Sequence, residues 1–339
     1  MVRASATIAF ALLGSSMCAT SQPATRNLLM EELTWVEVDA LDRERTVIIL
    51  PIGMVEQHGP HLPVGSDSFG VRYEAERVAE RVSAALDGWT VLSMPPLNYG
   101  QGGANDLGGR LSHPGTYAMR QSTLRSVVAD IGAELARNRF KWIFVMNGHG
   151  APSHHVAVND ACDFVSETFH VSMQSVSALL MADETLQAEA QKIAERYFTP
   201  DQLASFGVDV HAGVAETSAV LALRRDLVHP GYLRLPDQNG ASVAELREHA
   251  RAPGWQGYLS SPAHANARYG QDVEAFWIDG VTTLIRRAVN SEASTAKQAR
   301  YPDALLADPV VQQVNDEVRA YEAAFQNSLD AWLGQRNRR

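Results

Sequence analysis

The sequence has few cysteines, no long hydrophobic run and no excess of basic charge. Its two cysteines among 339 residues are too few for a disulfide framework. No stretch approaches the roughly 18 uninterrupted apolar residues of a membrane span. The 29 lysine and arginine residues are outnumbered by 39 acidic ones. The resulting net charge of −10 argues against a nucleic-acid partner, because such proteins concentrate basic charge. With 45% hydrophobic residues, the chain is expected to bury a substantial core.

Residues 1–25 have the layout of a secretory signal peptide. Arg3 supplies a positive charge, residues 6–14 form a short apolar run, and small and polar residues follow. A buried N-terminal strand is the alternative, but no turn chemistry closes the segment. We therefore expect a periplasmic or secreted protein. Cys18 could carry a lipid anchor, although residues 15–17 depart from the Leu-small-small pattern of bacterial lipoproteins.

Strand and helix patterns alternate along the chain after the leader. Residues 46–53 form a continuous β-branched run, typical of a strand that is covered on both faces. Further strands are predicted at 89–97, 141–148 and 170–180, with helices at 66–86, 117–138, 153–168 and 183–197. Parallel strands need crossover connections, so this order predicts an α/β fold, with three α/β/α layers and a mainly parallel central sheet.

The remaining segments are less regular. Residues 226–269 are poorly periodic and rich in proline and glycine, so we expect loops that wrap the domain. Helices are predicted at 273–289 and 309–333. The predicted organisation is a signal peptide at 1–25, one domain at 26–300, and a C-terminal helical extension at 301–339 packed on that domain. The glycine-rich residues 100–103 lack the Gly-Lys-Ser/Thr of a phosphate cradle and read as a flexible loop.

Ligands of open parallel sheets bind beyond the carboxyl ends of the strands, so the polar residues there are candidates for a site. The set that we single out is Glu56, His58, Asp67, His149 and Glu216, which we expect to come from three separate strand ends. Imidazole nitrogens and carboxylates bind Zn, Mn or Fe, and one carboxylate can bridge two ions. Spacing alone leaves a structural alternative open, because Asp67 could simply be a carboxylate at a helix N-terminus.

Other histidines have simpler interpretations. His154 and His155 stand at an expected helix start, where a solvated polar turn is the default. His61 lies between two prolines, so a rigid turn that holds its ring in a hydrogen bond competes with a role in substrate binding. The sequence contexts of His170, His229, His249 and His264 indicate surface or satisfied buried groups.

Several segments together resemble the creatininase (creatinine amidohydrolase) family. Residues 50–63, continuing to Asp67, are similar to the opening motif of that family. Its later signatures resemble residues 113–116 (His-Pro-Gly-Thr), 147–150 (Asn-Gly-His-Gly) and 211–218 (His-Ala-Gly-Val-Ala-Glu-Thr-Ser). The resemblance runs in order from about residue 33 to about residue 289 and leaves out the leader and the extension.

The resemblance implies a compact α/β/α fold, often hexameric, that hydrolyses amides with two divalent metal ions of Zn, Mn or Fe. Carried over by position, Glu56 and His149 would hold one metal, His58 the other, and Asp67 would bridge them. The metals would polarise the scissile carbonyl and lower the pKa of a bridging water. His211 corresponds to a histidine that shuttles protons near the substrate. The residues carried over as substrate contacts are His61, His113, Thr116 and His211.

Two departures from the family pattern bear on the substrate. Creatininases have a glutamate ligand two residues after the histidine of the Asn-Gly-His motif, and here Ala151 stands there. Glu216 is the candidate to complete the second metal site, with general base as its other role. Residues 206–209 also lack the tryptophan that helps enclose creatinine. Both changes weaken the case for creatinine as the substrate.

The resulting hypothesis is an exported two-metal amidohydrolase that acts on a small, often cyclic, amide and forms a homo-oligomer. The alternatives are a relative that hydrolyses a cyclic ketone or trims a peptide, and a secreted protein that binds metal without turnover. Metal analysis separates these classes, because about two ions per chain fit the enzyme and one or none fits the binding protein.

Overall fold

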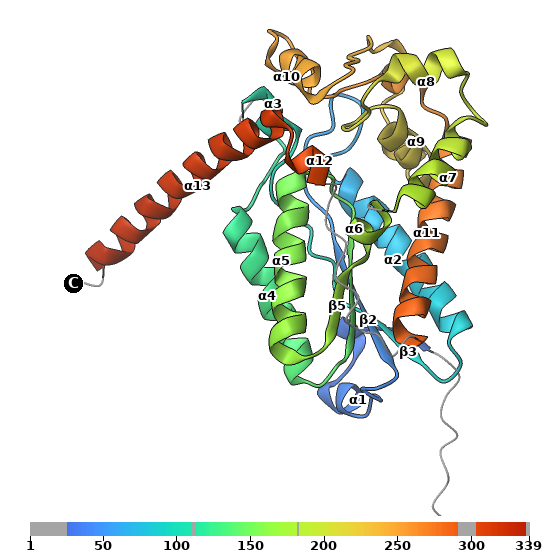
Figure 1. The fold of residues 1–339 in the computed structure, drawn as a ribbon, viewed down its shortest axis with the longest axis vertical. Coiled ribbons are helices and arrows are strands. Elements are labelled where there is room, and N and C mark those ends of the chain that lie inside the picture. The colour runs from blue at the N-terminus through green and yellow to red at the C-terminus, as the bar shows by residue number, and fades with distance from the viewer. Residues whose placement is uncertain (1–25, 110–112, 182, 291–302, 337–339) are drawn as a thin grey trace, which may run out of the picture.

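A parallel five-stranded sheet forms the centre of the computed structural model, which describes residues 26–109, 113–181, 183–290 and 303–336 (Figure 1). The predicted signal peptide and Cys18 lie outside the described residues. The strands are β1 (Arg26–Leu29), β2 (Thr46–Ile52), β3 (Thr90–Ser93), β4 (Trp142–Asn147) and β5 (Ser172–Ser175), in the order β1-β3-β2-β4-β5. All four strand pairs are parallel, which confirms the predicted α/β class.

Helices cover both faces of the sheet, as predicted. Helices α4 (Gln121–Arg137) and α5 (Pro152–Phe169) cover one face, and α2 (Ser66–Ala85) and α11 (Ala267–Asn290) cover the other. Successive residues of β2 therefore enter different cores: Ile48 packs towards α4 and α5, and Ile49 packs towards α2 and α11. Every residue of β2 is buried, which explains why its sequence reads as a continuous apolar run rather than an alternation.

Two predictions of secondary structure were wrong. The strand expected at 170–180 ends at Ser175, and helix α6 (Val176–Met181) follows directly. Alanine, leucine and methionine dominate that second half, and they favour helix over strand. The segment 226–269, expected to be loops, contains helix α10 (Val243–Arg251). The Ser242 hydroxyl caps α10 by accepting a hydrogen bond from the Glu245 amide, a start signal that the sequence carried.

Shorter helices complete the domain. They are α1 (Trp35–Asp39), α3 (Ala104–Gly108), α7 (Glu184–Ala194), α8 (Pro200–Phe206) and α9 (Val214–Leu223), together with 3₁₀ turns at Met30–Glu32, Arg225–Leu227, Pro230–Arg234 and Pro262–His264. Within the described residues, no helix combines the length and the apolar character that crossing a membrane requires.

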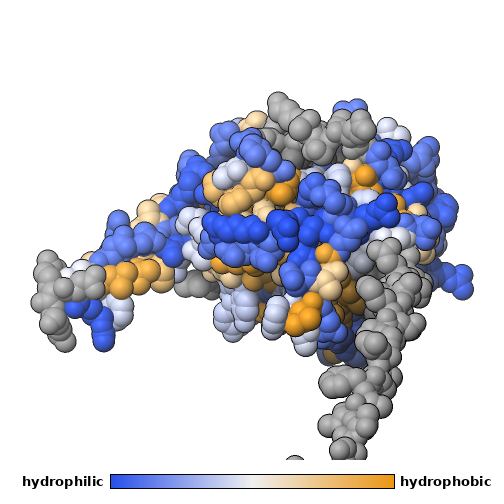
Figure 2. All heavy atoms as spheres, turned by 90° about the horizontal axis from the view of Figure 1, so that it is seen from below, coloured by the Kyte–Doolittle hydropathy of each residue, from blue (hydrophilic) through white to orange (hydrophobic). Residues whose placement is uncertain are grey.

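The C-terminal extension consists of α12 (Asp303–Leu306) and α13 (Pro309–Arg336). The first turns of α13 lie against α3 and α10, and the helix then projects away from the body of the molecule (Figure 1). Seen from below, hydrophobic side chains are visible along this projecting arm (Figure 2). Phe325, Trp332 and Leu333 are among its exposed residues.

Candidate metal centre

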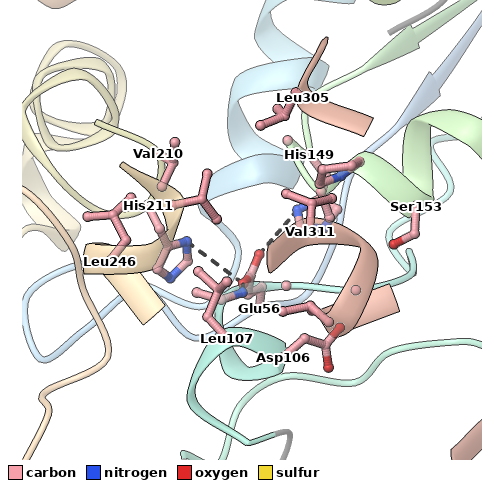
Figure 3. Close-up of a pocket in the computed structure, with 18 of the residues that line it drawn as sticks. Glu56, Asp106, Leu107, His149, Ser153, Val210, His211, Leu246, Leu305 and Val311 are labelled. Atoms are coloured by element: carbon pink, nitrogen blue, oxygen red, sulfur yellow. Dashed lines mark hydrogen bonds and ion pairs between the residues drawn. The ribbon is translucent and has the colours of Figure 1, made fainter. Parts of the chain in front are cut away.

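A cavity lies at the carboxyl ends of β2 and β4, where the sequence analysis expects a site (Figure 3). The turn after β2 carries Glu56 and His58, and the turn after β4 carries His149. Two glycines let these turns approach the first turn of α2, which carries Asp67. A Cβ atom on Gly53 would lie 2.7 Å from the Ser68 backbone, and one on Gly148 would lie 2.6 Å from the Asp67 carbonyl oxygen.

The orientation of the His58 ring is that of a metal ligand. Its Nδ1 lies 2.9 Å from the carbonyl oxygen of Glu56, which can only accept, so Nδ1 carries the proton. In neutral His58 the lone pair is then on Nε2, which lies 3.1 Å from Asp67 Oδ1 and 3.6 Å from Glu216 Oε2. These three atoms can each accept a hydrogen bond, and they face one another in a buried place. A cation bound between them would serve as the partner of all three.

Asp67 lies between the two halves of the cluster. Its Oδ1 faces His58, and its Oδ2 accepts a hydrogen bond from His149 Nδ1 at 2.9 Å. One carboxylate oxygen therefore points to each of two neighbouring groups. This is the geometry that a bridging carboxylate needs.

Glu56 is held at the floor of the cavity by its neighbours. The Ala104 amide donates a hydrogen bond of 2.6 Å to Oε1, and His149 Nδ1 lies 3.1 Å from Oε2. Gly103, with φ +133°, allows this approach, because a Cβ there would lie 2.6 Å from Oε1. The glycine-rich loop at 100–103 thus closes against Glu56.

Glu216 comes from the first turn of α9, so the expectation that all five candidates follow strand ends was wrong for this residue. Its Oε2 accepts a hydrogen bond of 2.5 Å from the amide of Ala212, whose φ is +51°. The Glu216 side chain is 38% exposed, whereas those of Glu56 and Asp67 are almost fully buried. Among the three carboxylates, Glu216 is therefore the one that an incoming molecule would reach.

His211 faces the cluster with its Nδ1. Its Nε2 lies 2.8 Å from the Gln57 carbonyl oxygen and therefore carries the proton of the neutral ring. Nδ1 lies 3.8 Å from Glu56 Oε1, on the cavity side (Figure 3). Burial lowers the pKa of His211 to about 4, so the ring is neutral at pH 7 and Nδ1 can accept a proton.

The buried carboxylates of the cluster favour the binding of a positive charge. Burial lowers the pKa of His58, but the carboxylates of Asp67 and Glu216 outweigh it and raise the pKa to about 10. Desolvation at the cavity floor raises the pKa of Glu216 to about 7. The excess of buried carboxylates thus stabilises a cation in their midst, whether a proton or a metal ion.

Three groups of side chains could hold a metal ion, each with ligand atoms within 4.8 Å of one another. They are Glu56-Asp67-His149, His58-Asp67-Glu216 and Glu56-His58-His211. The first two share Asp67 and together contain all five predicted ligands. The mixed nitrogen and oxygen donors suit Zn, Mn or Fe.

The other predicted substrate contacts lie outside the lining of the cavity. His61 Nε2 lies 3.0 Å from the Thr217 hydroxyl, and the Thr116 hydroxyl accepts a hydrogen bond from the Gln57 amide. The ring of His113 packs on Trp255. In this structure Thr116 supports the turn that carries Glu56 and His58, and His61 is tied to α9. Contact of the three residues with substrate stays a prediction.

His154 and His155 are both buried, so the expectation of a solvated turn was wrong. The ring of His154 packs edge-on against His149, and its Nδ1 accepts a hydrogen bond from the Gln101 amide. Burial lowers the pKa of both histidines, so both are neutral. The two rings pack beside His149, because α5 begins shortly after the end of β4.

The apolar walls of the cavity were missed by the sequence analysis. The glycine-rich loop expected at 100–103 lines the cavity through Gly102 and Gly103. The other walls include Leu107 of α3, Leu246 of α10, and Val311 and Val314 of α13. No motif marks these residues, and the signals for the helix that carries Leu246 were the Ser242 cap and the amphipathic pattern of 243–251.

Comparison with known proteins agrees with this geometry. The family profile described as Creatininase, creatinine amidohydrolase, matches residues 31–285. The creatinine amidohydrolase of Pseudomonas putida is 30% identical over 268 residues, covering 77% of this chain and 97% of that protein. The mycofactocin precursor peptide peptidase of Mycobacterium ulcerans is 30% identical over 249 residues, covering 71% of this chain and 84% of that one.

Solved structures are similar to most of the chain. A manganese creatininase aligns with a TM-score of 0.59 and 27% identity, covering 78% of this chain and all of that one. A creatininase mutant of Zn-Zn type aligns with the same TM-score and identity and covers 79% of this chain.

Proposed function

The chain belongs to the creatininase family, and we propose that it is an exported two-metal hydrolase that cleaves the C–N bond of a small amide. The observation that carries the proposal is the position of His58 Nε2, which lies 3.1 Å from Asp67 Oδ1 and 3.6 Å from Glu216 Oε2, so that a metal ion in place of a proton would bind all three atoms. The shared position of Asp67 between two donor groups supports two ions rather than one.

Each metal ion has an assigned set of ligands in this proposal. Glu56 and His149 would hold the first ion, His58 and Glu216 would hold the second, and both sites would share Asp67. Glu216 thereby replaces the glutamate that creatininases have where this chain has Ala151. The ions supply Lewis acidity, which polarises a bound carbonyl and lowers the pKa of water.

The residues of the chain orient the groups and move the proton. His58 keeps its Nε2 lone pair towards the site because its Nδ1–H is held by the Glu56 carbonyl oxygen. His211 accepts the proton of the attacking water at Nδ1 and donates it to the leaving nitrogen as the C–N bond breaks. Its Nε2–H stays on the Gln57 carbonyl oxygen, which fixes the ring for both transfers.

Cleavage of a peptide is the second candidate function. It is favoured by the similarity to mycofactocin precursor peptide peptidases over 71% of this chain. The same centre would hydrolyse a peptide bond, since both reactions attack an amide carbonyl. The size of the substrate, rather than the chemistry, separates the two candidates.

Export and assembly complete the proposal. The layout of residues 1–25 supports cleavage of a signal peptide and a periplasmic or secreted location. The alternative is a membrane-anchored protein with a lipid attached at Cys18. Membership of the creatininase family supports a homo-oligomer, and we propose a hexamer. Size-exclusion chromatography with light scattering on the mature protein tests the assembly.

The decisive experiment joins metal analysis to a substrate screen. The mature protein is reconstituted with Zn or Mn, its metal content is measured by mass spectrometry, and cyclic amides, linear amides and short peptides are assayed in parallel. About two ions per chain and turnover of an amide are expected. One ion or none, with no turnover, would favour the non-catalytic metal-binding protein instead.

A further inference from the structure

The cavity at the metal centre has two unlike sides. Its floor is polar and carries Glu56, His149, His211 and Glu216. Its walls are mainly apolar, with Asp106, Ser153 and Asn315 as polar exceptions (Figure 3). They include Leu107 of α3, Val210, Leu246 of α10, Leu305 of α12, and Val311 and Val314 of α13.

The C-terminal extension supplies half of these wall residues. Val311 and Val314 are 7% and 9% exposed, so the first turn of α13 is packed into the body rather than resting on its surface. This part of the chain follows residue 285, where the match to the family profile ends. The extension therefore lies outside the part of the chain that the family profile matches.

Polar contacts fix the extension over the cavity. The Glu317 carboxylate pairs with Arg247 at 2.6 Å and with Arg251 at 2.9 Å, which ties α13 to α10. One turn and a half further on, Glu322 accepts a hydrogen bond of 2.9 Å from the Gln121 amide at the start of α4. Two separate elements thus hold α13 just after the turns that carry Val311 and Val314.

The charges of the cavity lining disfavour a substrate group that carries a negative charge. None of the residues that line the cavity within the described part of the chain is lysine or arginine. Apart from the metal ligands, the charged residue of the lining is Asp106. A substrate carboxylate placed against the walls would lose its hydration without gaining a cationic partner, which is costly. An uncharged apolar group would instead gain from leaving water.

We infer that the extension selects amides that carry an uncharged aliphatic group beside the scissile carbonyl. This inference rests on the proposed function, because the metal centre is what anchors the carbonyl. With the carbonyl at the floor, the group attached to it is directed towards Val311 and Val314. The extension is thus a specificity element of the site, and α13 is its main part.

The test measures binding rather than turnover, with simple hydroxamates as metal-chelating probes. Acetohydroxamate reports the metal centre alone, and isocaprohydroxamate adds an isobutyl group that reaches the walls. Succinic monohydroxamate adds a carboxylate instead. Dissociation constants are measured by calorimetry on the full-length mature protein after loading with zinc. Isocaprohydroxamate is expected to bind roughly tenfold more tightly than acetohydroxamate, and succinic monohydroxamate no more tightly than it.

Two buried valines on one helix provide a matched pair of variants. Val314→Thr places a hydroxyl in the wall, and Val318→Thr places one at a residue that is equally buried but does not line the cavity. Val314→Thr is expected to reduce the preference for the isobutyl probe roughly fivefold. Val318→Thr should leave that preference as it is. Val311→Thr repeats the test should Val314→Thr fold poorly.

The outcomes separate the two proposals. If acetohydroxamate binds but the isobutyl group adds nothing, or if both valine variants change the preference equally, the role of the extension is refuted and the metal centre stands. If acetohydroxamate fails to bind the zinc-treated protein and no zinc is retained, the proposed function fails, and the inference that rests on it fails too.

Discussion

Two clusters of buried carboxylates in this molecule neutralise their charge in different ways. At the metal centre, Glu56 and Asp67 face the rings of three histidines. Between α2 and α11, Glu74 and Glu274 hydrogen bond to each other instead. Burial raises the pKa of Glu74 to about 7, and burial with the charge of Glu74 raises that of Glu274 further. The second cluster is therefore neutralised by protons.

The two clusters differ because the carboxylates of the metal centre lie next to histidines and those of Glu74 and Glu274 do not. His58 directs Nε2 towards its carboxylates because a backbone carbonyl holds its other nitrogen. Glu74 and Glu274 have no such neighbour, and within the described residues Glu274 Oε2 has no hydrogen-bond partner. A proton can bind between two carboxyl groups, whereas Zn or Mn also needs nitrogen or further oxygen ligands. Burial of acids alone therefore does not make a metal site.

Replacing His58 should have the largest effect, because it removes the lone pair that distinguishes the two clusters. His58→Ala is expected to abolish turnover of any amide substrate and to reduce the metal content from about two ions per chain to about one. Metal content is measured by mass spectrometry on the reconstituted protein. Retained activity at the level of the unmodified protein would contradict the assignment.

His170→Asn is the control for this variant. His170 is exposed, ends α5 with φ +56°, and stands far from the cavity, and asparagine tolerates that backbone conformation. Its metal content and turnover should match those of the unmodified protein. A parallel loss in both variants would point to damage by the reconstitution procedure.

Replacing His211 tests whether this residue of the metal centre transfers protons or binds metal. His211→Ala is expected to lower turnover on the order of a hundredfold or more, since a positioned acid or base contributes that much. The metal content should stay at about two ions, because His211 stands outside both assigned ligand sets. Loss of an ion would instead make His211 a ligand together with Glu56 and His58, the third group that the geometry allows.

A change at Gly103 disturbs the position of one carboxylate without removing any ligand. Gly103→Ala places a Cβ 2.6 Å from Glu56 Oε1 and is expected to weaken binding of the first metal ion several-fold, as measured by competition with a chelator. Gly109→Ala is the matched control, because Gly109 also has a positive φ but no atom within 4 Å of the new Cβ. Both variants should lose about 1 kcal/mol of stability or more. Equal metal affinity in the two variants would show that Glu56 is not a ligand.

The sequence allowed the clustering of the candidate metal ligands to be predicted better than the cavity around them. Glu56, His58 and His149 follow buried strands, and parallel strands bring such residues together at one edge of the sheet. Asp67 at the start of α2 and Glu216 were added to the set by the pattern of residue types and by resemblance. What could not be predicted was that Glu216 stands on a helix, since 209–218 gave no periodic signal for α9.

Neither the second acid cluster nor the contacts of the apolar walls could be predicted from the sequence. Glu74 and Glu274 are separated by 200 residues, and each stands in a helix where a charged residue is normally solvated. Val311 and Val314 fit the expected amphipathic helix at 309–333, but periodicity does not say what an apolar face will contact. Contacts between distant helices depend on the packed structure as a whole.

The smallest effect is expected at the proton-bound pair and concerns stability. Because the pKa of Glu74 is raised from 4.5 to about 7 on folding, its stabilising proton is present below pH 4.5 and is lost as the pH rises through 7. Glu274→Gln keeps the shape, removes one acid and can donate a hydrogen bond to the remaining carboxylate. At pH 8.5 this variant should therefore be more stable than the unmodified protein by about 1 to 2 kcal/mol.

Thermal unfolding at pH 5 and pH 8.5 measures this difference. The advantage of Glu274→Gln should be present at pH 8.5 and largely absent at pH 5, where both carboxyl groups of the unmodified protein keep their protons. Glu76→Gln, an exposed position two residues after Glu74, removes the same charge and should show no such pH dependence. An advantage of equal size at both pH values would mean that Glu74 and Glu274 do not share a proton. The pair would then owe its stability to packing, and the contrast with the metal centre would rest on the histidines alone.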